Sequence, residues 1–212
     1  MTVDTSNLGK FYIAGQWVAP RSQANMPVLN PANERQIGIV PLGDAADVDA
    51  AVAAAVSAFP AYSQTRKSER VALLQSLMKV TQSRFEDLAQ AMRMEMGAPI
   101  TMAREAQADA AIGHLQGFMD ALAELVERET LSNGDILLRE PIGVCGLITP
   151  WNWPMNQIAL KVIPALATGC CCVLKPSEHT PISAMIYAEI IDAAGFPPGV
   201  FNLVQGDGPT VG

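Results

Sequence analysis

The chain has 212 residues, of which 50% are hydrophobic and 17% are charged, and its formal net charge is −7. This composition is typical of a globular protein with a sizeable core and excludes a disordered chain. The acidic balance argues against a nucleic-acid partner, because phosphate binding needs a basic face and the longest basic run is Arg66-Lys67.

The N-terminal half predicts a hairpin and three long helices. The segment FYIAGQWV at 11–18 has the pattern of a tight hairpin, and a turn at Asn30-Pro31 precedes a strand through Ile37 and Val40. Helices are expected from Asp44, an N-cap, from near Ser68 to Gly97, and from about Thr101 to Glu129. Their predicted core-facing stripes are Val48, Val52, Val56 and Phe59; Val71, Leu74, Met78, Phe85, Leu88 and Met92; and Ile112, Leu115, Met119, Leu122 and Val126.

The C-terminal part predicts a repeated strand–helix unit. After a turn at 132–135 and a short strand at 136–139, strands are expected at 143–148, 170–174 and 200–204, with starts about 28 residues apart, the period of βαβ units. Pro154 and Pro181 suit first helical positions, and Gly169 and Gly195 suit helix ends. Because the strands are continuously apolar, we predict an α/β fold with an incomplete, Rossmann-like parallel sheet.

No membrane segment is predicted. The sequence MTVDTSNLGK at the N-terminus lacks the apolar core of a signal peptide. The longest nearly apolar run, 162–174, is about 13 residues, whereas a membrane span needs roughly 20. We expect a cytoplasmic protein.

Four cysteines, Cys145 and Cys170 to Cys172, fall within predicted buried strands. Neighbouring residues of a strand point to opposite faces, so the contiguous three cannot share one metal. The two histidines have no metal-ligand spacing, so we expect no metal site and interpret the thiols as buried and reduced.

Three segments follow the predicted strands, at 149–152, 175–178 and 206–212. Open parallel sheets bind their ligands at the carboxyl ends of the strands, which is where these segments begin. The last reads G-x-G-x-x-x-G, which fits either a nucleotide-binding turn or a plain turn. Glu178 can accept hydrogen bonds from ribose hydroxyls and repel a 2′-phosphate, which favours NAD over NADP. Lys175 contacts the same ribose or weakens that preference, and the alternative is a solvated Lys/Glu pair.

Asn152 is the strongest single candidate for a catalytic residue. Its amide is a neutral donor at a strand-to-helix corner, where it can stabilise a developing oxyanion by roughly 3 kcal/mol. The alternative is an N-cap beside Pro154.

The segments TPWNWP and LKPSE, 20 residues apart, together resemble the aldehyde dehydrogenase family, and the resemblance extends over nearly the whole chain from Phe11. It implies that Asn152 is the oxyanion donor and that Lys175 and Glu178 bind the adenosine ribose. It also implies a catalytic role in a buried charge relay for Lys161, which could otherwise extend its amine to water. Further cofactor-binding positions expected are Ile148, Pro150, Trp151, Asn152 itself, Ser177, Gly208, Pro209 and Gly212, and those lining the aldehyde tunnel are Trp153, Asn156 and Gln157.

The resemblance also implies an incomplete enzyme. The catalytic cysteine and the glutamate that activates water belong to family motifs beyond Gly212, so we expect the 212 residues alone to be inactive. The expected organisation is a hairpin and helical part of the cofactor domain at 1–130, an oligomerisation hairpin at 131–142 and a truncated NAD-binding core at 143–212. An intact protein would be a dimer or tetramer acting on a small aldehyde; the alternative is a non-catalytic nucleotide-binding or interaction module, or an inactive gene fragment.

Overall fold

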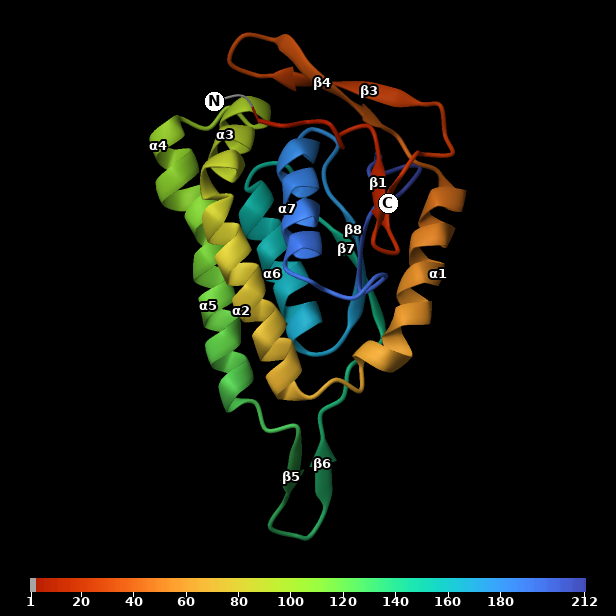
Figure 1. Cartoon of the computed structure of the whole chain (residues 1–212), viewed down its shortest axis with the longest axis vertical. Helices are drawn as coiled ribbons and strands as arrows, with labels where there is room; N and C mark the ends of the chain where they lie inside the picture. The colour runs from red at the N-terminus through yellow and green to blue at the C-terminus, as the bar shows by residue number, and fades with distance from the viewer. Residues whose placement is uncertain (1–2) are drawn as a thin grey trace.

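The computed structural model describes residues 3–212, and its centre is a five-stranded sheet in the order β2-β1-β9-β8-β7 (Figure 1). The three strands of the predicted repeat are parallel to one another, which confirms the Rossmann-like sheet. The strands are β1 (Phe11–Ile13), β2 (Gln16–Val18), β7 (Val144–Ile148), β8 (Cys171–Lys175) and β9 (Phe201–Leu203).

The N-terminal hairpin is part of this sheet. Ala14 and Gly15 form its turn with positive φ, as the sequence indicated. Strand β1 also pairs antiparallel with β9, with Tyr12 opposite Leu203, and Asn202 Oδ1 accepts a hydrogen bond from Ala14 N at 3.0 Å. The hairpin therefore covers the β9 side, while β7 is the unpaired edge on the other side within residues 3–212.

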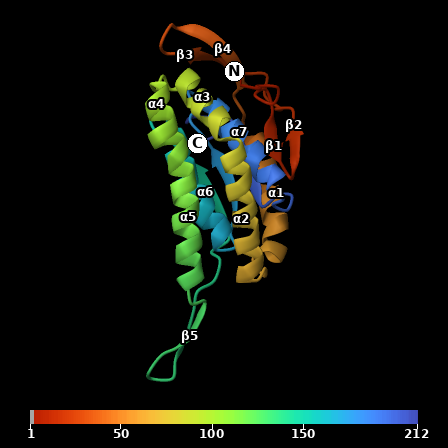
Figure 2. The same ribbon diagram turned by 60° about the vertical axis from the view of Figure 1, so that its left-hand side comes forward.

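The helices form layers on the two faces of the sheet (Figures 1 and 2). Helix α1 packs on one face, and α6 and α7 pack on the other, beneath an outer layer formed by α2, α3 and α5. The bounds are α1 (Ala45–Tyr62), α2 (Lys67–Ser83), α3 (Phe85–Glu95), α4 (Ile100–Met102), π-helical η1 (Ala103–Ala108), α5 (Asp109–Glu124), α6 (Pro154–Ala167) and α7 (Pro181–Ala193).

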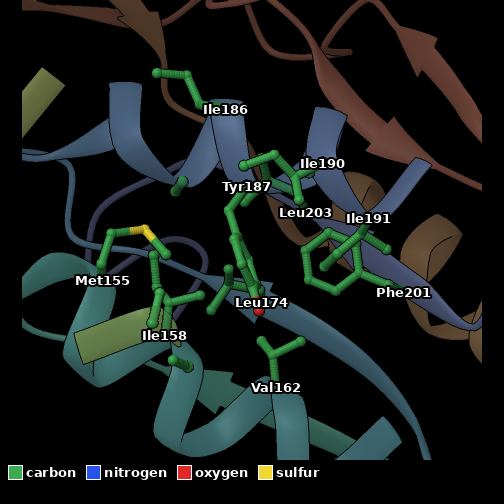
Figure 3. Close-up of a cluster of buried hydrophobic side chains, with 14 of the residues drawn as sticks. Met155, Ile158, Val162, Leu174, Ile186, Tyr187, Ile190, Ile191, Phe201 and Leu203 are labelled. Carbon is green, nitrogen blue, oxygen red and sulfur yellow. The ribbon is translucent and has the colours of Figure 1, made fainter. Parts of the chain in front are cut away.

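A continuous apolar cluster joins α6, α7 and the sheet (Figure 3). Leu174 of β8 is fully buried where the two helices meet the sheet, close to Tyr187 and Ile158. Burial of this kind of cluster is the main stabilising term for the layers. The labelled side chains are Met155, Ile158, Val162, Leu174, Ile186, Tyr187, Ile190, Ile191, Phe201 and Leu203.

Several details of the predicted helices are wrong. In α1, Val52 and Val56 are exposed, because the face of the helix that packs on β8 and β9 is rotated from the predicted stripe and carries Ala51, Ala55 and Tyr62. The second predicted helix is two, α2 and α3, because the backbone leaves the helical region at Arg84.

The third predicted helix consists of α4, η1 and α5. It ends at Glu124, since Leu125 has extended backbone, and Val126 is consequently exposed. Residues expected at its C-terminal end instead begin strand β5.

Two further hairpins extend from the layers. The first, β3 (Asn25–Asn30) with β4 (Arg35–Pro41), contains the predicted turn after Asn30 and the predicted strand, although β3 itself was not foreseen. The second, β5 (Arg128–Thr130) with β6 (Ile136–Leu138), projects from the end opposite β3 and β4 (Figure 1). No helix within residues 3–212 combines the length and the apolar character needed to cross a bilayer.

Candidate functional site

The three predicted site segments leave the sheet at one edge. Ile148 at the end of β7 is the register partner of Lys175 at the end of β8, and Thr149 N donates to the Lys175 carbonyl at 3.1 Å. Val204, just beyond β9, donates its N–H to the carbonyl of Leu174 at 3.0 Å. The segments that carry Asn152 and Glu178 therefore begin side by side, as the sequence predicted.

The Asn152 corner is an exposed turn between β7 and α6. Trp153, not Asn152, occupies the N-cap position of α6, and Pro154 is the first helical residue. The Asn152 side chain is exposed and forms no hydrogen bond within the described part of the chain. The alternative of a helix cap is therefore wrong, and the amide is free to donate to a ligand.

Three of the predicted cofactor-binding positions beside this corner are exposed. Ile148 and Trp151 expose 56% and 54% of their surface, and Pro150 is exposed as well. Such side chains at a strand end are available to contact an apolar face of a ligand.

The proposed substrate positions lie on the first turn of α6. Trp153, Asn156 and Gln157 are half-buried. His114 Nε2 of α5 donates to Asn156 Oδ1 at 2.8 Å, a contact that fixes the amide between two helices. The sequence did not indicate His114 as a neighbour, since 42 residues separate the two.

Lys175 and Glu178, the two residues predicted to bind the adenosine ribose (the ribose clamp), contact each other. Lys175 is buried, and its Nζ donates to the Pro176 carbonyl at 2.9 Å and to Glu178 Oε2 at 3.3 Å. Glu178 is partly exposed, so the pair is not the solvated pair considered above. Ser177 is buried, and its Oγ accepts a hydrogen bond from His179 N at 3.3 Å.

The glycine-rich segment after β9 forms a single turn. Asp207 Oδ1 accepts from Thr210 N at 3.0 Å and from Thr210 Oγ1 at 2.5 Å, and this lowers the pKa of Asp207. A Cβ at Gly212 would lie 2.8 Å from Gly208 O, whereas a Cβ at Gly208 would meet no atom within 4 Å. The turn itself therefore needs Gly212, while Gly208 borders open space and Pro209 is exposed beside it.

A cavity of about 830 Å³ opens beside the two loops. Trp151 of the β7–α6 loop and His179 and Thr180 of the β8–α7 loop line it together with residues of the β3–β4 hairpin and the end of α3. Glu95, the last residue of α3, lines the same cavity and was not recognised in the sequence. Burial raises its pKa to about 7, against the opposing effect of hydrogen bonds from Ser183 and Ile182.

Lys161 lies on α6 and is partly buried. It has no ion-pair or hydrogen-bond partner among residues 3–212, so its role in a charge relay stays a prediction.

The four thiols are poor nucleophiles. Cys170, Cys171 and Cys172 are buried, and burial raises the pKa of Cys171 to about 12 and that of Cys172 well above its usual value. Cys145 is only half-buried, contrary to expectation, because β7 is an edge strand; burial still raises its pKa. Burial therefore favours the unreactive protonated form of Cys145, Cys171 and Cys172.

Comparison with known proteins places these features in one family. The sequence profile of the aldehyde dehydrogenase family matches residues 17–212. A 3-succinoylsemialdehyde-pyridine dehydrogenase from a Pseudomonas species is 50% identical over 204 residues, which cover 96% of this chain and 43% of that protein.

Two solved structures show the same fold. A mutant of aldehyde dehydrogenase C from Pseudomonas syringae, in complex with NAD+ and octanal, is 48% identical with a TM-score of 0.96 over 99% of this chain and 43% of its own. An NADP-dependent enzyme from E. coli is 35% identical with a TM-score of 0.91 over 99% of this chain and 45% of its own. The chain thus spans less than half the length of these relatives. By its sequence and its fold, it belongs to the aldehyde dehydrogenase family.

Proposed function

We propose that this chain is the cofactor-binding portion of an NAD-dependent aldehyde dehydrogenase that oxidises an aldehyde to a carboxylic acid. The observation that carries the proposal is that β7, β8 and β9 are parallel neighbours, so the segments that carry Asn152, the Lys175–Glu178 pair and the glycine turn all follow the carboxyl ends of adjacent strands. NAD, when bound, would accept the hydride released from the substrate.

The residues at this edge fit the cofactor. Glu178 is partly exposed and keeps carboxylate oxygens for ribose hydroxyls, while buried Lys175 holds it from behind. The space beside Gly208 has the character of a pyrophosphate path, because the backbone there is approachable and an added Cβ would project into it. The carboxylate of Glu178 favours NAD over NADP, since it would repel a 2′-phosphate.

The proposed catalytic contribution of the chain is Asn152. Attack of a thiolate on an aldehyde creates negative charge on the former carbonyl oxygen, and a fixed amide donor stabilises that charge. The thiolate would come from a cysteine outside these residues, because Cys170, Cys171 and Cys172 are buried and burial raises the pKa of Cys145, Cys171 and Cys172. Trp153, Asn156 and Gln157 would line the aldehyde site. Alone, the chain would form no NADH.

The exposed hairpin supports a proposal about assembly. The β5–β6 strands present Ile136, Leu137 and Leu138, which expose 51%, 38% and 50% of their surface. Exposed apolar side chains on a projecting hairpin are typical of a contact between subunits. We propose that the intact protein is a homo-oligomer.

The test compares NAD binding and turnover in two variants. For the 212-residue chain, titration calorimetry should give a Kd for NAD that rises about tenfold in Glu178→Gln, with a smaller preference over NADP, and stays unchanged in Asn152→Ala. In an enzyme containing the downstream cysteine and glutamate, Asn152→Ala should lower kcat by about 10²- to 10³-fold. An unaltered kcat with rate-limiting hydride transfer would refute the role of Asn152, and absence of NAD binding would refute the cofactor site.

The alternative is a non-catalytic nucleotide-binding module. It is favoured by one observation, the absence of a reactive thiol among the residues described. NAD binding together with a reading frame that ends at Gly212 would support it, whereas continuation into a domain with a cysteine and a glutamate would support the enzyme.

A further inference from the structure

The first turn of α7 receives its cap from a distant part of the chain. Thr180 occupies the N-cap position, but its side chain makes no capping hydrogen bond. Instead, Glu95 Oε2 accepts from Ile182 N at 2.5 Å, and Glu95 Oε1 accepts from Ser183 N at 2.9 Å. Glu95 is 4% exposed and forms no ion pair within residues 3–212, so these two amides are its main polar partners.

A second buried side chain holds the same turn from the sheet side. Gln205 follows β9, is 1% exposed, and donates from Nε2 to the Pro181 carbonyl at 3.2 Å. It directly precedes Gly206, where the glycine turn begins. The start of α7 is therefore fixed to α3 through Glu95 and to the glycine turn through Gln205.

The proposed ribose clamp lies immediately before this anchored turn. Only residues 176–180 separate β8 from α7, and the loop has few hydrogen bonds of its own: Thr180 N donates to the Ser177 carbonyl at 3.1 Å, and Ser177 Oγ accepts from His179 N. Lys175 Nζ, at the end of β8, donates to Glu178 Oε2 at 3.3 Å and holds the carboxylate from the sheet side, while the path of the loop backbone is set by its two ends. One end is the sheet, and the other is the turn that Glu95 caps.

We infer that Glu95 is a positioning residue for cofactor binding: by capping α7 it fixes the loop that carries Glu178 in register with the glycine turn after Gln205. This inference rests on the proposed function. It assigns a role to a buried acid that neither contacts the proposed cofactor residues directly nor belongs to their loop. Supporting groups of this kind set how accurately a binding residue is held.

The test measures the Kd for NAD in two Glu95 variants of the 212-residue chain. Glu95→Leu removes both acceptor oxygens at similar volume, and we expect the Kd to rise about tenfold or more, since small displacements of binding groups are costly. Glu95→Gln retains one acceptor oxygen and should give an intermediate Kd. Hydrogen exchange at the amides of Ile182 and Ser183 should accelerate in the same order.

The matched control is Arg70→Met on α2. Arg70 is also buried; it donates to the Ala167 carbonyl at the end of α6 at 2.9 Å and pairs with Glu127, and no hydrogen bond joins it to α7 or to the ribose clamp. Its loss should lower the melting temperature but leave the Kd for NAD unchanged. An equal rise in Kd in Arg70→Met would show general loosening and overturn the inference.

Other outcomes are equally decisive. If Glu95→Leu does not fold, Glu95→Gln decides the question, because a wild-type Kd in that variant overturns the positioning role. If the wild-type chain binds NAD and both Glu95 variants bind it with the same Kd, this inference is refuted while the proposed function stands. Failure of the wild-type chain to bind NAD would refute the proposed function and, with it, this inference.

Discussion

Glu95 should make the stability of the fold depend on pH. Its carboxyl is fully buried in the α7 cap, and burial raises its pKa from 4.5 to about 7. Between these two values the folded chain keeps a proton that the unfolded chain has released. The free energy of unfolding therefore falls as pH rises through this window, by about 1.4 kcal/mol per pH unit.

The total effect follows from the width of the window. From pH 4.5 to about pH 7 the contribution amounts to roughly 3 kcal/mol, present in full below 4.5 and lost above about 7. Urea unfolding of wild type and Glu95→Gln at a series of pH values measures it as the difference between the two proteins. The difference in the free energy of unfolding between wild type and Glu95→Gln should shrink by roughly 3 kcal/mol from pH 4.5 to about pH 7.

An internal control is available in Glu86. The hydrogen bond from Arg104, with a further one from Gln90, lowers the pKa of this exposed carboxyl to about 2, below the window. Glu86→Gln should therefore keep the wild-type slope between pH 4.5 and about 7. Parallel curves for wild type and Glu95→Gln would refute the assignment of the slope to Glu95.

Two further predictions concern packing and thiol chemistry. Gly199 has φ +84°, and an added Cβ would lie 2.7 Å from Ala54 O of α1, so Gly199→Ala should destabilise the fold by about 1–3 kcal/mol, seen as a lower urea midpoint; an unchanged midpoint would contradict the close α1 contact. Half-buried Cys145 should react with a thiol reagent well before the three buried cysteines, and Cys145→Ser should abolish the fast phase. Two or more fast thiols in the native chain would contradict the burial of β8.

The parts of the fold that could be predicted are those encoded locally. Pro154 and Pro181 begin α6 and α7 as expected, and each helix is followed by its glycine within two residues of its last residue. The apolar strands between them fix the parallel repeat, because only a sheet covered on both faces accommodates continuous apolar runs.

The errors arise where tertiary contacts override local pattern. Val52 and Val56 have helical spacing, yet α1 packs on the sheet through the neighbouring face that carries Ala51, Ala55 and Tyr62. The pairing of β1 with β9 joins residues far apart in the sequence, Tyr12 and Leu203, and no local signal encodes it.

The same distinction applies to the site. Strand ends of a parallel sheet share an edge, so the positions of Asn152 and Glu178 followed from the strand pattern alone. The cap formed by Glu95 could not be predicted, because 87 residues separate it from Ile182. Within the sequence of α3, Glu95 is only an acidic residue at the end of a helix, and nothing there indicates its partner. The sequence therefore indicates which residues can contact a ligand, but not which buried residues hold them in place.

Residues that the fold does not need are the best indicators of the site. Gly199 is required by its backbone and by Ala54, whereas Gly208 has an unstrained backbone and open space where a side chain would fit. Trp151 and Ile148 are apolar yet more than half exposed, and the amide of Asn152 is unused by the helix it precedes. Exposed apolar side chains add little to the stability of the fold, and neither does a glycine at a position where any residue would fit. Ile148, Trp151, Asn152 and Gly208 all lie at or after the carboxyl ends of the parallel strands, which is where we propose that the cofactor binds.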